Sequence, residues 1–238
     1  MLGVAIGQLL LRRGTEEDTR LALTMFAKNV EDYPQSKSAE DALYMKFSTE
    51  YLLEQHAVAA ASIAVYLEKY PKGRYLPNAL YYKAMCLMAL GNLEEALQIV
   101  NTVIDQYPKK TETFEAQDEV FYQKGAMLVQ MKKSDEAIKH FKLFPERFPE
   151  SPLRPQVLFQ LGVAYNAAEQ LDQAKAALEE VAVLFPEHEI APLALYQIGV
   201  FFYERKDYSR MAAALEHLVQ TFPNCAQVAD AYFWMGWI

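Results

Sequence analysis

An aromatic residue followed directly by proline recurs six times along this 238-residue chain, and this recurrence constrains the fold more than any other feature. Successive prolines lie 37, 37, 41, 37 and 37 residues apart. A fixed period of this length is typical of repeat proteins, in which each stretch of sequence forms the same small unit. The pairs are Tyr33-Pro34, Tyr70-Pro71, Tyr107-Pro108, Phe148-Pro149, Phe185-Pro186 and Phe222-Pro223.

Each repeat has the pattern of two helices. Apolar residues in segment 77–90 follow the i, i+4, i+7, i+8 spacing of one helix face, and the rhythm returns in 93–106. Proline cannot continue a helix but fits its first turn, so Pro71 ends one helix and Pro77 begins the next. We therefore expect antiparallel A and B helices in hairpins at about 1–33, 37–70, 74–107, 115–148, 152–185 and 189–222, with a partial A helix at 226–238.

Two further columns of residues keep the same period. Residues 24 positions before the prolines are mostly small, and residues eight positions before them are large and apolar. Small residues on facing helices allow the two backbones to approach closely, and large apolar residues fill the space around them. Stacked hairpins then bury their apolar faces together. We expect one solenoid over residues 1–238. The first column is Leu10, Phe47, Ala84, Gly125, Gly162 and Gly199, and the second is Phe26, Ile63, Val100, Phe141, Leu178 and Leu215.

Composition excludes several functions. The formal net charge is −8 and no basic stripe is present, which argues against nucleic-acid binding. No apolar run approaches the roughly 18 residues of a membrane span. The two cysteines, Cys86 and Cys225, fit neither a disulfide framework nor a metal cluster. Catalytic and metal-binding motifs are missing, so we expect no enzyme activity, no metal and no cofactor.

The columns resemble the tetratricopeptide repeat (TPR). In one repeat the resemblance is carried by Leu80, Ala84, Leu87, Gly91, Ala96, Val100 and Pro108, and in another by Gly162, Tyr165, Ala174, Leu178 and Pro186. It implies an all-α, right-handed α-α superhelix of about six hairpins. The longer turn after each proline is similar to bacterial envelope TPR proteins, namely the lipoprotein of the BAM complex and the Tol–Pal coordinator. This implies a periplasmic or outer-membrane-associated protein, with the cytoplasm as the alternative.

An aromatic column on the A helices is the main candidate binding site. It contains Tyr44, Tyr81, Tyr122, Phe159, Tyr196 and Phe233. Two turns further along the same face stand Tyr51, Met88, Val129, Asn166 and Tyr203, and Gln123, Gln160 and Gln197 flank the column. Rings with interleaved amides on the concave face suit a peptide or a partner protein. The alternative is that these aromatic residues only pack adjacent repeats together.

Two irregularities lead to further expectations. The spacing of 41 places four extra residues around 109–119, either as a protruding functional loop or as a tolerated surface insertion. The partial A helix at the end would expose Phe233, Trp234 and Trp237, so we expect a fragment of a longer repeat protein that can self-associate there; the alternative is a capping helix. A scaffold that binds proteins is the first functional hypothesis, and a targeting region of a larger enzyme or secretion or polysaccharide-export machine is the second.

Overall fold

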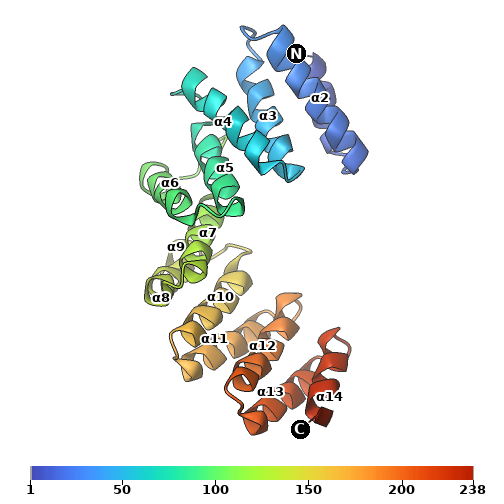
Figure 1. Cartoon of the computed structure of the whole chain (residues 1–238), viewed down its shortest axis with the longest axis vertical. Helices are drawn as coiled ribbons and strands as arrows, with labels where there is room; N and C mark the ends of the chain where they lie inside the picture. Colours follow the sequence, from blue (N-terminus) through green and yellow to red (C-terminus); the bar gives the residue numbers. More distant parts are fainter. Residues whose placement is uncertain (1, 238) are drawn as a thin grey trace. The chain divides into compact units, whose positions relative to one another are not determined.

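The computed structural model describes residues 2–237, which form helices joined by short turns (Figure 1). Within these residues β-pairing is limited to an isolated bridge between Thr111 and Phe114. The helices are α1 (Leu2–Leu11), α2 (Glu16–Asp32), α3 (Ala39–Leu52), α4 (His56–Lys69), α5 (Leu76–Ala89), α6 (Leu93–Gln106), α7 (Gln117–Gln130), α8 (Ser134–Lys142), α9 (Phe144–Arg147), α10 (Arg154–Ala167), α11 (Leu171–Leu184), α12 (Ile190–Glu204), α13 (Tyr208–Thr221) and α14 (Gln227–Trp237).

The helices pack as successive hairpins in two compact units. Unit 1 contains the residues up to Val120, and unit 2 those from Phe121. In each unit a helix packs against its hairpin partner and against the first helix of the next hairpin, as α3 does with α4 and α5, and α12 with α13 and α14. The all-α repeat fold predicted from the sequence is confirmed, and the single solenoid over the whole chain stays a prediction.

Each aromatic–proline pair ends a B helix, and all the pairs except Tyr107-Pro108 continue into the same turn. The aromatic residue is the last one bonded to the helix, as Tyr70 shows by donating its amide to the Tyr66 carbonyl at 2.8 Å. Its own carbonyl then accepts the amide three residues further on, such as that of Gly73 at 2.9 Å, which makes a β-turn with proline at its second position. The pair therefore recurs because one residue ends the helix and the other sets the turn.

The A helices end in a left-handed residue, which turns the chain into the B helix. Gly91 has φ 84°, and Glu54, Lys132, Glu169 and Lys206 have φ between 58° and 61°. The backbone amide of the residue after the left-handed one donates to the carbonyl five residues before it, as Asn92 donates to Leu87 at 2.8 Å. This is the Schellman arrangement, for which glycine is preferred but not obligatory.

The small and large columns meet inside each hairpin. A Cβ placed on Gly125 would collide with the Phe141 ring, and one on Gly199 would lie 2.7 Å from Leu215. In the first hairpin the residue that faces Phe26 is Gly7 and not the residue at position 10. A Cβ placed on Gly7 would lie 2.5 Å from the Phe26 ring. Placing Leu10 in this column was therefore wrong by about one helical turn, because α2 has 17 residues where α4 and α6 have 14, and so begins about one turn earlier.

The extra residues after Pro108 form an anchored turn in unit 1. Thr111 and Phe114 bond to each other, and the Phe114 side chain is buried at 1% exposure. The Gln117 amide donates to the Lys109 carbonyl at 2.8 Å, and the Thr113 hydroxyl donates to the Arg74 carbonyl at 2.8 Å. Part of the insertion thus belongs to the core, because its aromatic residue is enclosed.

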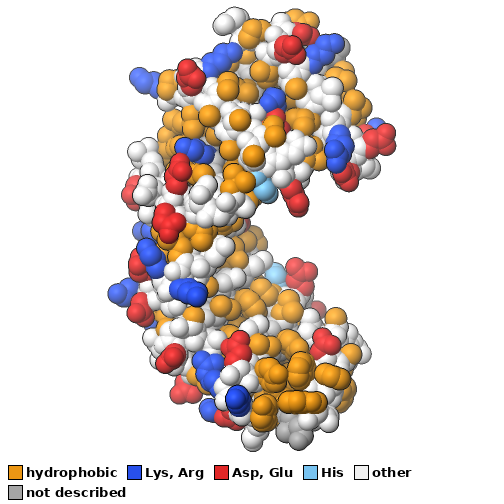
Figure 2. Space-filling view, viewed as in Figure 1, with side chains coloured by type: hydrophobic (Ala, Val, Ile, Leu, Met, Phe, Trp, Pro, Cys, Tyr) orange, Lys and Arg blue, Asp and Glu red, His pale blue; other side chains and the backbone are white. Residues whose placement is uncertain are grey.

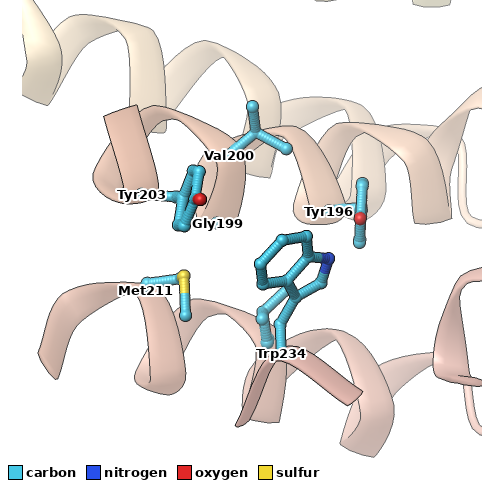
Figure 3. Close-up of a pocket in the computed structure, with 7 residues that line it drawn as sticks. Tyr196, Gly199, Val200, Tyr203, Met211 and Trp234 are labelled. Atoms are coloured by element: carbon cyan, nitrogen blue, oxygen red, sulfur yellow. The ribbon is translucent and has the colours of Figure 1, made fainter. Parts of the chain in front are cut away.

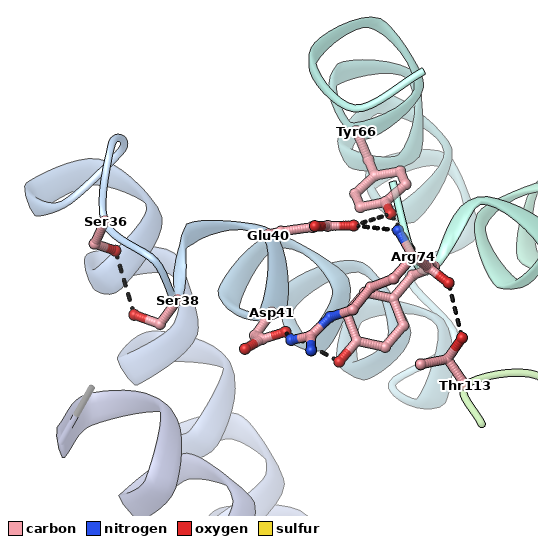
Figure 4. A network of polar contacts seen from close by, with 8 residues as sticks. Ser36, Ser38, Glu40, Asp41, Tyr66, Arg74 and Thr113 are labelled. Carbon is pink, nitrogen blue, oxygen red and sulfur yellow. Dashed lines mark hydrogen bonds and ion pairs between the residues drawn. The ribbon is translucent and has the colours of Figure 1, made fainter. Parts of the chain in front are cut away.

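Unit 1 also contains a polar network at the junction of α3, α4 and α5 (Figure 4). The Glu40 carboxylate accepts hydrogen bonds from the Tyr66 hydroxyl at 2.7 Å and the Arg74 amide at 2.8 Å, while Asp41 pairs with the Arg74 guanidinium. Burial raises the pKa of Tyr66, and the bond to Glu40 raises it further. A Cβ on Gly73 would collide with the Tyr66 hydroxyl, so the network requires glycine there.

Candidate functional site

On α3 in unit 1, the predicted site residues Tyr44 and Tyr51 contact aromatic residues of the next repeat. Tyr44 stacks on Tyr75, with centroids 4.0 Å apart and planes at 5°, and Tyr51 meets Tyr82 at 5.1 Å and 66°. Both predicted residues are half-buried, and burial raises the pKa of each hydroxyl. In unit 1 this face of the A helices therefore contributes to packing between repeats.

On α5, Tyr81 is also half-buried, and its hydroxyl lies 3.5 Å from the Glu119 carboxylate as a hydrogen-bond donor. Burial raises the pKa of Tyr81, and the Glu119 charge raises it further. Burial also raises the pKa of the adjacent Tyr82 to about 12. Met88, two turns along the helix, is half-buried. The phenols on this face stay protonated at neutral pH, so they act as hydrogen-bonding and apolar surfaces.

Six further predicted residues lie on α7, α10 and α12 in unit 2, and all of them are half-buried. These residues are Tyr122, Gln123, Phe159, Gln160, Asn166 and Gln197. Tyr122 lies 6.4 Å from Phe141 between ring centroids. The Asn166 Oδ1 atom is buried and has no hydrogen-bond partner among the described residues. That oxygen is available to a donor only after local movement, because it is covered.

A cavity on the predicted face lies in unit 2, between α12, α13 and α14 (Figure 3). Its volume is about 230 Å³, and Tyr196, Tyr203 and Trp234 form its aromatic walls. Figure 3 shows the Trp234 indole reaching from α14 toward α12, between the two tyrosines. The centroids of Tyr203 and Trp234 are 5.0 Å apart. The structure thus brings together the predicted residues Tyr196 and Tyr203.

The other walls of the cavity come from the helix-packing columns. Gly199 of α12 contributes no side chain, and the buried Met211 and Leu215 of α13 form the inner wall. Because no lining residue carries a charge, the cavity suits an apolar group. Tyrosine hydroxyls and the indole N–H are the polar groups at its walls, and they can bond to a polar neighbour of that group.

Sequence reasoning placed Trp234 only at an exposed end and missed its place in this cavity. Trp234 stands 37 residues after Gln197, so an aromatic ring replaces the glutamine of the preceding repeats. Tyr82 holds the same column in unit 1. This aromatic substitution in the glutamine column was visible in the sequence and could have indicated the site.

Beside the cavity, unit 2 exposes several large apolar side chains. Tyr232, Phe233 and Trp237 are 59%, 66% and 59% exposed. In Figure 2, hydrophobic side chains gather on the part of unit 2 where Figure 1 places α13 and α14. The apolar surface of α14 therefore continues outward from the cavity wall.

The buried ionisable groups elsewhere have packing roles. Burial raises the pKa of the Cys86 thiol to about 11, which makes it unreactive at neutral pH. His140 stacks on Phe121 at 3.7 Å, and its Nε2–H donates to the Phe121 carbonyl at 2.7 Å. Burial lowers the pKa of His140 to about 4. Among residues 2–237, no three His, Cys, Asp or Glu side chains gather as they would around a metal ion.

Comparison with known families decides the relationship. The model of the YfiO family, described as outer membrane lipoprotein, matches residues 114–235, just over half of the chain. The chain belongs to the YfiO family. A tetratricopeptide repeat model also matches residues 78–110 of this YfiO-family chain, which is therefore a TPR protein. No helix in its described part is both long enough and apolar enough to span a bilayer.

Solved structures with the same fold are distant in sequence. The C-terminal part of a TPR repeat-containing protein from Cytophaga hutchinsonii gives a TM-score of 0.70 at 17% identity, over 96% of this chain and 83% of that one. A TPR protein from Parabacteroides merdae gives 0.67 at 13%, over 98% and 97%. YrrB, described as a TPR protein with an unusual peptide-binding site, gives 0.58 at 16%, over 87% and 97%. These likenesses show the fold alone. A search of curated proteins found no match.

Proposed function

We propose that this chain is a non-catalytic scaffold that binds a peptide or partner protein along the A-helix face, within a bacterial cell-envelope assembly. The observation that carries the proposal is the open apolar cavity beside Tyr196, Tyr203 and Trp234, on the face that the sequence predicted. Apolar pockets with aromatic walls are where partner side chains contribute most to affinity. The TPR fold, which is generally a non-catalytic scaffold, supports the absence of enzyme activity.

Family membership supports the location in the envelope, because the matching family is described as outer membrane lipoproteins. YrrB, which shares the fold, is described as having a peptide-binding site, and this supports peptide binding here. A basic surface for nucleic acid is not expected from the net charge of −8.

Site-specific photo-crosslinking in the native cell tests this function. A benzophenone side chain at Tyr203, which is 39% exposed, is expected to capture a discrete partner protein in the envelope fraction. The matched control is the same probe at Val183, which is 75% exposed on the B helix α11. Equal capture from both positions, or capture only in the cytosolic fraction, contradicts the proposal.

A second copy of the chain is the alternative partner, because Phe233 and Trp237 are exposed next to the cavity. Light scattering measures the molar mass of the wild type and of a Phe233→Ser, Trp237→Ser variant, and so distinguishes self-association from binding of a different partner. A wild-type dimer that the variant converts to monomer would assign the apolar surface of α14 to self-association.

A further inference from the structure

The unit 2 cavity has a counterpart in unit 1, and that counterpart is filled. Positions 152 residues apart are equivalent, since three periods of 37 and one of 41 separate them. Tyr44, Tyr51 and Tyr82 in unit 1 correspond to Tyr196, Tyr203 and Trp234 in unit 2. All three walls are therefore aromatic in both units.

The residue that fills the unit 1 counterpart is Phe47, which is 0% exposed. Its ring meets Tyr44 at 5.4 Å and 85°, and Tyr82 at 5.9 Å and 67°. These are the edge-to-face contacts that aromatic rings prefer. A phenyl ring thus occupies this place in the repeat when the chain supplies one.

In unit 2 the equivalent of Phe47 is Gly199, which supplies no side chain. Leu215 of α13 comes within 2.7 Å of the position of a Cβ on Gly199, but the space beside Tyr203 and Trp234 stays open. An apolar cavity of about 150 Å³ is known to admit benzene. The cavity of about 230 Å³ therefore has room for a phenyl side chain.

We propose that the cavity between α12, α13 and α14 is a recognition pocket for one phenylalanine side chain of a bound partner, held as Phe47 is held in unit 1. This inference rests on the proposed scaffold function and adds the chemistry of the partner's anchor residue. The uncharged lining disfavours a lysine, arginine or acidic anchor, because each would lose its hydration without a counter-charge. Tyr196, Tyr203 and Trp234 supply the edge-to-face contacts.

Trp234 provides a direct readout, since Trp237 is the other tryptophan of the chain. In a Trp237→Phe background, titration with toluene or N-acetylphenylalanine amide is expected to change the Trp234 emission saturably. N-acetyllysine amide, the matched control, is expected to leave it unchanged. Absence of a saturable change with both aromatic probes overturns the proposal.

A filled-pocket variant completes the test. Gly199→Phe combined with Leu215→Ile reproduces the Phe47 and Ile63 pair of unit 1, and is expected to weaken binding of both probes at least tenfold. Val200→Trp, which narrows the cavity from its α12 wall, serves the same purpose if the first variant does not fold. Undiminished probe binding in a folded variant overturns the proposal.

The crosslinking experiment separates this inference from the scaffold function. With the pocket filled, capture of the partner at Tyr203 is expected to fall at least tenfold. If probe binding is lost while capture persists unchanged, the phenylalanine pocket is refuted and the scaffold function stands. If wild-type capture at Tyr203 fails, the scaffold function fails, whatever the small aromatic probes show.

Discussion

Phe47 of unit 1 and Gly199 of unit 2 hold the same place in the repeat, but their surroundings are packed in opposite ways. Phe47 is enclosed by Tyr44, Tyr82 and residues of α4, whereas Gly199 leaves a cavity beside Trp234. The helices and turns around both positions are of the same kind. The repeat therefore fixes the backbone, while the side chains at several equivalent positions together decide whether a hairpin has a closed core or an open site.

The same two hairpins also differ at the junction with the A helix of the next repeat, which is α5 in unit 1 and α14 in unit 2. In unit 1 the junction is held by Glu40, Tyr66 and Gly73. Their equivalents in unit 2 are Pro192, Leu218 and Cys225, which cannot form that network. Leu218 is buried, so an apolar contact replaces the hydrogen bonds. This junction is therefore stabilised by hydrogen bonds in unit 1 and by apolar packing in unit 2.

Phe47→Ala should have the largest effect, because it opens in unit 1 the space that is open in unit 2. The loss of a fully buried phenyl ring is expected to lower the free energy of unfolding by about 3–5 kcal/mol. Urea denaturation measures this, with Leu52→Ala as the control since Leu52 is 63% exposed. A loss within about 0.5 kcal/mol of the control would show that the Phe47 site is not tightly packed.

Protonation of His140 should reduce stability as the pH falls. Burial, with a smaller contribution from the positive charges of Lys124 and Arg147, lowers its pKa from 6.5 to about 4, although the hydrogen bond to Phe121 acts in the opposite direction. Between these values the unfolded chain binds a proton that the folded chain does not, so about 3 kcal/mol of stability is lost from pH 6.5 to pH 4. Below about pH 4 both states are protonated and this loss stops growing.

The equivalents of His140 in unit 1 are Ile99 and Ser62, and neither of them titrates. The variant His140→Ser should therefore lose less stability than the wild type between pH 6.5 and pH 4, as measured by urea denaturation at several pH values. Parallel pH profiles for the two proteins would contradict the assignment of His140 as a buried neutral group.

Gly73→Ala should destabilise unit 1 by about 1–3 kcal/mol, because the new methyl group would displace Tyr66 or Glu40 from their hydrogen bond. The matched control is Cys225→Ala at the equivalent position of unit 2, which should change the free energy of unfolding by less than about 0.5 kcal/mol. Equal effects at the two positions would remove the distinction between the polar and the apolar junction.

Tyr66→Phe should have the smallest effect, about 1 kcal/mol, because it removes one hydroxyl that bonds to Glu40 and to the Tyr75 amide at 3.0 Å. The ring remains and keeps its packing against Phe47 at 5.6 Å. Thermal unfolding measures the change. A loss above 3 kcal/mol would mean that the hydroxyl holds more of the junction than these two bonds.

The hairpins were predictable from the sequence because proline, glycine and apolar spacing act locally. Proline also acts locally in one B helix, because α8 ends at Lys142 and α9 begins at Phe144, next to Pro145. The register of the first hairpin was missed, since Leu10 and Gly7 are about one turn apart and periodicity alone does not choose between them. The cavity was also missed, because it depends on how the side chains of α12, α13 and α14 pack around Trp234, which periodicity does not determine.

The most direct test of the open and filled sites is a crystal of the chain soaked in iodobenzene, with the iodine located by anomalous scattering. In the wild type, an iodine peak is expected between Tyr203 and Trp234, and none is expected beside Phe47. In Phe47→Ala a second peak is expected at the unit 1 site. No peak beside Trp234, or peaks of equal height at both wild-type sites, would contradict the claim that unit 2 leaves open what unit 1 fills.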